Sequence, residues 1–93
     1  MPRYLIERVF GDVEQEAMQN IGQRMKDVAR QDFPDVKWEH SHVVSDESGI
    51  KTYCVYQAPD EDQLRAHGAQ VRDHTITHVY EIAGDVTPAD FAG

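Results

Sequence analysis

The sequence lacks several features that would direct a functional assignment. Its 93 residues include a single cysteine, which excludes an intrachain disulfide. Nine Lys and Arg residues stand against 17 Asp and Glu, a net charge of −8 that opposes binding to nucleic-acid phosphates. No apolar stretch approaches the ~20 residues that cross a bilayer, and the chain opens without a secretory signal. We therefore expect a soluble, cytoplasmic protein that binds neither nucleic acid nor membrane.

Familiar catalytic motifs are absent as well. The chain has no Gly-rich phosphate loop and no CxxC, HExxH, GxSxG or SxxK pattern, which removes the usual support for nucleotide binding, thiol exchange and standard hydrolysis. The length predicts one domain, residues 1–84, followed by a tail, residues 85–93. A core of this size leaves little surplus stability, so we expect an oligomer.

What is present is a clear alternation of apolar and polar residues. Asp12 with Gln15, and Asp60 with Gln63, have the spacing of capping boxes at two helix starts. Pro34 ends the first helix near residue 31. The predicted order is strand 3–10, helix 12–31, strand 36–44, strand 50–58, helix 60–72 and strand 76–83.

This βαββαβ order is typical of the ferredoxin-like α+β fold, a four-stranded antiparallel sheet with two helices on one face. Strand 3–10 is then central, next to strands 50–58 and 76–83. Large apolar residues occur on both sides of the strands. The face of the sheet without helices would therefore expose apolar surface to water unless something packs on it. A second copy is the simplest cover, and two sheets packed face to face form a dimeric α/β barrel with an internal cavity.

The two middle strands carry the sharpest chemical prediction. A five-residue turn, residues 45–49, places Val44 opposite Ile50. The pairs that follow are His42–Thr52, His40–Cys54 and Trp38–Tyr56. Opposed residues lie about 4.5–5.5 Å apart at Cβ, close enough for an imidazole and a thiolate to bind one divalent metal, with His42 as a second imidazole. The alternatives are packed or edge histidines and a Cys54 that acts as a small apolar core residue.

Two further residues are candidates for the same site. Glu7 is a charged residue on an otherwise apolar side of strand 3–10. We expect it to reach the cavity as a ligand or proton acceptor. Its alternative is an ion pair with Arg8, Arg3 or Lys51. His67 shares a helical side with apolar residues, so it is either a ligand or a core histidine. His74 and His78 have no partner that the sequence assigns.

Three stretches resemble a small-protein family of unknown function whose characterised representative binds nickel: PRYLIERVF, VKWEHSHVVSDESGIKTYCVYQAPDEDQLRAH and THVYEI. The resemblance implies a ferredoxin-like fold, a dimeric α/β barrel and a divalent metal, nickel in particular, held by histidines and acidic groups. The family positions that match are His40, Cys54, Glu7 and His67, whereas His42 is added from spacing alone. The chain departs from the family after the second helix, where GAQVRDHTITH replaces a Gly-apolar-Pro segment.

Three functions are compatible with these observations. The first is a small metal-binding protein with the ligands His40, His42, Cys54, Glu7 and His67. The second is a cofactor-free dimeric barrel enzyme that uses His40 or Glu7 as acid or base on a small organic ligand. A pocket lined by Trp38, Tyr53 and Tyr56 would favour this enzyme. The third is an interaction module without a site.

Overall fold

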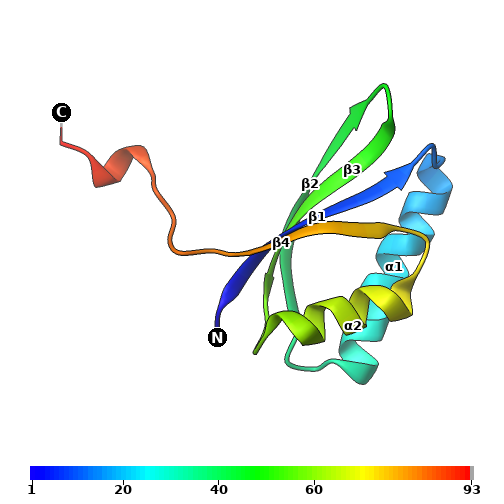
Figure 1. Cartoon of the computed structure of the whole chain (residues 1–93), viewed down its shortest axis with the longest axis horizontal. Helices are drawn as coiled ribbons and strands as arrows, with labels where there is room; N and C mark the ends of the chain where they lie inside the picture. Colours follow the sequence, from blue (N-terminus) through cyan, green and yellow to red (C-terminus); the bar gives the residue numbers. More distant parts are fainter. Residues whose placement is uncertain (93) are drawn as a thin grey trace.

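The computed structural model describes residues 1–92 and contains the expected elements in the expected order. They are β1 (Arg3–Gly11), α1 (Gln15–Asp32), β2 (Lys37–Asp46), β3 (Gly49–Gln57), α2 (Glu61–Val71), β4 (Thr75–Glu81) and a 3-10 turn, η1 (Pro88–Asp90). All strand pairs are antiparallel, in the sheet order β2-β3-β1-β4, and both helices lie on one side of the sheet (Figure 1). The ferredoxin-like α+β fold predicted from the sequence is therefore confirmed.

The core lies between the sheet and the two helices. Every second residue of β1 is buried, and this side of the strand carries Tyr4, Ile6, Arg8 and Phe10. The helices add their own apolar sides, which are Ile21, Met25 and Ala29 from α1 and Leu64 and Val71 from α2. The opposite side of the sheet has no helix over it. No helix in the described part of the chain is long and apolar enough to cross a membrane.

The two predicted helix starts had different outcomes. Asp60 caps α2 as expected, because its side chain accepts a hydrogen bond from the backbone N–H of Gln63 at 2.9 Å. The capping box at Asp12 is wrong: α1 begins at Gln15, with Glu14 as an N-cap that makes no side-chain cap bond. A tight turn from Gly11 (φ +73) explains the delay, since the N–H of residue 13 bonds the Gly11 carbonyl and keeps Asp12 outside the helix.

The β2–β3 hairpin is tighter than predicted. Asp46 pairs with Gly49, so the tip contains two residues rather than five. The Asp46 carboxylate accepts hydrogen bonds from the backbone N–H and hydroxyl of Ser48, at 2.8 and 2.6 Å. Gly49 has φ +111, and a Cβ there would lie 2.3 Å from the Gly11 carbonyl carbon, so the turn requires glycine.

This turn shifts the predicted register by one residue. Ile50 lies opposite Ser45 and not Val44, and Cys54 lies opposite Ser41 and not His40. The predicted Trp38–Tyr56 pair is nevertheless confirmed, because β2 contains a bulge at Glu39 that restores the alignment. Since a shift of one residue moves a side chain to the other face, the predicted His40–Cys54 pair is wrong.

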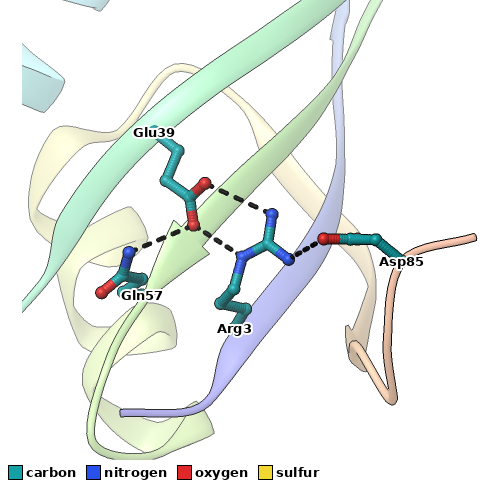
Figure 2. A network of polar contacts seen from close by, with 4 residues as sticks. All are labelled: Arg3, Glu39, Gln57 and Asp85. Atoms are coloured by element: carbon teal, nitrogen blue, oxygen red, sulfur yellow. Dashed lines mark hydrogen bonds and ion pairs between the residues drawn. The ribbon is translucent and has the colours of Figure 1, made fainter. Parts of the chain in front are cut away.

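The bulge is held by a polar network that spans the sheet (Figure 2). Arg3 donates to both carboxylate oxygens of Glu39, at 2.8 and 3.3 Å, and to Asp85 at 2.6 Å. Gln57 donates a longer hydrogen bond to Glu39, 3.4 Å. The network therefore connects the bulge in β2 with β1, β3 and the segment that follows β4.

Candidate functional site

The candidate site lies on the sheet face turned away from the helices, here called the open face. The strand register places on it Leu5, Glu7, Val9, His40, His42, Val44, Lys51, Tyr53, Val55, His78 and Tyr80. Most of the polar members form one row across the four strands, in the order His42, Tyr53, Glu7, His78. The open face thus gathers three of the five histidines together with Glu7.

Glu7 lies at the centre of this row in a dense set of hydrogen bonds. Its carboxylate oxygen accepts from the Thr77 hydroxyl at 2.5 Å and lies 3.1 Å from Nδ1 of His78. The Thr77 hydroxyl, then the Tyr53 hydroxyl and His78, lower the pKa of Glu7 to about 2. Glu7 is therefore an anion at neutral pH, suited to hold a cation and poorly suited to accept a proton.

His40 and His42 form a second group on the same face. Both are exposed and are two residues apart on one side of β2, with ring centroids 5.4 Å apart and ring planes at 85°. Neither ring makes a hydrogen bond to another described residue. Their imidazole nitrogens are thus free to bind a metal ion, although His42 is two strands, about 10 Å, from Glu7.

The other two predicted ligands lie on the helix side of the sheet. Cys54 is 1% exposed, and its thiol lies 3.3 Å from the Thr52 hydroxyl. His67 is fully buried in α2, and its Nε2 lies 2.8 Å from the Met25 carbonyl oxygen. Burial lowers the pKa of His67, which keeps the ring neutral. The structure therefore separates the five candidates into Glu7, His40 and His42 on the open face and Cys54 and His67 in the core.

The structure also separates the residues expected to line an enzymatic pocket. Tyr53 lies on the open face, whereas Trp38 and Tyr56 are stacked on the helix side, with ring centroids 6.3 Å apart. A cavity of about 400 Å³ does open between α1 and the β2–β3 hairpin, lined largely by apolar side chains and reaching Trp38 and Cys54. Neither His40 nor Glu7 lines it, so it contains neither of the predicted acid–base groups.

Within residues 1–92, no three His, Cys, Asp or Glu side chains are close enough to hold a metal ion together. One chain offers two separate pairs, His40 with His42 and Glu7 with His78. A complete coordination shell would therefore need ligands from outside this chain.

Comparison with known proteins identifies the family of the chain. The family model of nickel responsive proteins described as SCO4226-like matches residues 4–82. The chain belongs to this SCO4226-like family. No protein of curated function matches the chain. The match covers β1 through β4, and therefore includes the whole open face.

Sequence reasoning missed the partner of Glu7. The ion pair considered for Glu7 involved arginine or lysine, but the structure pairs it with His78, while Arg3 binds Glu39 and Asp85. A bulge between Glu7 and Arg8 in the β1–β4 ladder brings both Thr77 and His78 to the carboxylate. In this SCO4226-like chain, the partner of Glu7 could have been predicted from the presence of Thr77 and His78 together on a strand next to β1.

Proposed function

We propose that this SCO4226-like protein is a cytoplasmic divalent-metal-binding homodimer, with nickel as the favoured ion and the metal bound at the open face. The observation that supports the proposal best is the His40–His42 pair. The two imidazoles are exposed, adjacent and without hydrogen-bond partners among the described residues. A net charge of −8 attracts cations to the molecule.

The donor set fits a borderline metal ion. Neutral imidazole suits nickel, copper and zinc, whereas an all-oxygen site would suit magnesium or calcium. The family description names nickel responsiveness, which favours nickel within this group. His40 and His42 would bind the ion directly, and Glu7 with His78 would add an anionic group on the same face.

A second copy of the chain would supply the metal ligands that one chain lacks. Beside the polar row, the open face carries Leu5, Val55 and Tyr80 in a neighbouring apolar row, in which Val55 is already buried and Tyr80 is 54% exposed. Packing two open faces together would cover this apolar surface and form the dimeric α/β barrel. A two-fold axis would also present the imidazoles of both copies inside the barrel, so that the dimer completes the coordination shell.

Calorimetric titration of Ni²⁺ into metal-free protein tests the proposal. We expect binding at micromolar concentrations in the wild type. His40→Ala and His42→Ala should each weaken it by at least the roughly 10–100-fold that loss of a supporting residue costs a metal site.

Cys54→Ala is the matched control, because it removes a strong metal ligand that lies on the other side of the sheet. This variant should bind Ni²⁺ as the wild type does. Absence of binding in the wild type, or equal affinity in the wild type and both histidine variants, would overturn the proposal.

A further inference from the structure

Arg8 is a charged side chain in the middle of the core. It is 0% exposed, and its guanidinium carbon lies 5.4 Å from the centre of the Tyr56 ring. Among residues 1–92 no carboxylate lies within ion-pair distance of it. Proteins rarely bury an arginine without a counter-ion, because removing the charge from water costs several kcal/mol.

The hydrogen bonds of Arg8 are also incomplete. Only NH1 has an acceptor, Nε2 of His74 at 2.6 Å, while the Nε and NH2 groups have no partner among the described residues. Nδ1 of His74 lies 2.9 Å from the Arg72 carbonyl, so this nitrogen donates and Nε2 accepts. His74 is therefore a neutral substitute in the place where an anion would serve Arg8 better.

A cavity lies directly outside this contact. It has a volume of about 290 Å³ and is lined by Arg65, Gly68, Ala69, His74, Thr75 and Ile76. Gly68 brings it close to Arg8, since a Cβ at this position would lie 2.6 Å from Cδ1 of Ile76, 3.2 Å from NH1 of Arg8 and 3.5 Å from Nε2 of His74. The cavity therefore lies beside the Arg8–His74 contact, although Arg8 itself does not line it.

The segment that carries His74 is strained. Arg72 and Asp73 have φ values of +65° and +63°, which side-chain-bearing residues rarely adopt. Asp73 is fixed by an ion pair with Arg24, and the His74 ring stacks on Phe10 with centroids 5.3 Å apart. His74 is thus held in place by these contacts and not by a relaxed backbone.

We propose that Arg8 is the anchor of a small-anion site that His74 closes, and that a carboxylate or oxyanion enters through the neighbouring cavity and replaces Nε2 of His74 as the acceptor. NH1 and the unpartnered NH2 would both donate to the bound oxygens. Arg65 lies at the mouth of the cavity but is paired with Glu61, so the charge that would hold the anion is that of Arg8. This site lies on the helix side of the sheet and does not depend on the metal proposed for the open face.

Thermal unfolding with inorganic phosphate as the probe tests this site. Wild type and His74→Ala are compared in phosphate and in chloride of equal ionic strength, at pH 7.5 with EDTA. At about ten times its dissociation constant, phosphate should raise the Tm of the wild type by ~7 °C relative to chloride. The shift should be larger in His74→Ala, because the competing acceptor has been removed.

Two arginine variants separate a site from a general salt effect. Arg8→Met should lose the phosphate-dependent shift, whereas Arg30→Met, at an exposed position on α1, should retain it. Arg8→Met removes a core residue and is at risk of not folding. The comparison of the phosphate-dependent Tm shift in the wild type and in His74→Ala therefore tests the proposal without this variant. Equal Tm values in phosphate and chloride for both the wild type and His74→Ala would overturn the proposal.

Discussion

At the scale of single residues, the histidines occupy two chemical environments. His40 and His42 are exposed on the open face, where their nitrogens are available to a metal ion. His67 and His74 are packed against the core, and burial is the largest cause that lowers the pKa of each. For His74, the nearby guanidinium of Arg8 lowers the pKa further, while its bond to the Arg72 carbonyl and the charge of Asp73 oppose the shift.

These lowered pKa values predict that acid destabilises the protein. The folded state resists protonation of His67 and His74, whereas the unfolded chain binds these protons near pH 6.5. The contribution to stability is therefore complete above pH 6.5 and is lost as pH falls toward the folded-state pKa values. We expect Tm, measured in chloride between pH 8 and pH 5, to decrease over this interval.

Substitution of the half-buried His74 identifies the source of this effect. His74→Asn should flatten the dependence of Tm on pH. Glu7 does not affect the slope between pH 8 and pH 5. Because its pKa is about 2 in the folded state, its contribution to the free energy of unfolding is lost only below pH 4.5. Identical slopes for the wild type and His74→Asn would contradict this explanation.

At the scale of elements, the β2–β3 hairpin determines which side chains share a face. Its two-residue tip depends on Gly49, which has a positive φ and has no room for a Cβ beside Gly11. Gly49→Ala should therefore lower the free energy of unfolding by roughly 2–4 kcal/mol. The measurement is urea denaturation followed by circular dichroism.

Gly22 provides the matched comparison within α1. A Cβ at Gly22 would have no neighbour within 4 Å, and the residue has helical backbone. Gly22→Ala should raise the free energy of unfolding by roughly 0.5–1 kcal/mol, because alanine loses less backbone entropy in a helix. A destabilisation of similar size in both variants would show that close approach at Gly49 is not the cause.

The same hairpin shows how far the sequence predicts this structure. Apolar alternation in β1 and the Asp60 cap are local signals, and the fold, strand order and second helix start follow from them correctly. The faces of β2 are different. They depend on the bulge at Glu39, which is held by Arg3, 36 positions away in the sequence. The predicted partner of Cys54 was wrong because the hairpin tip has two residues rather than five, whereas Trp38–Tyr56 is correct because the bulge, which no local pattern contains, restores the alignment.

At the scale of the whole molecule, the fold has two layers and one uncovered face. The helices pack on one side of the sheet only (Figure 1). The molecule measures 19 Å along its shortest axis. Aromatic and aliphatic side chains share the open face with three histidines. We therefore propose that both the dimer contact and the metal lie on this surface.

Anomalous scattering at the nickel edge, from crystals soaked in Ni²⁺, tests this assignment most directly. The account predicts a peak beside His40 and His42, between the open faces of two copies. A peak beside Cys54 or His67, on the helix side of the sheet, would contradict it, as would nickel on an open face that no second copy covers.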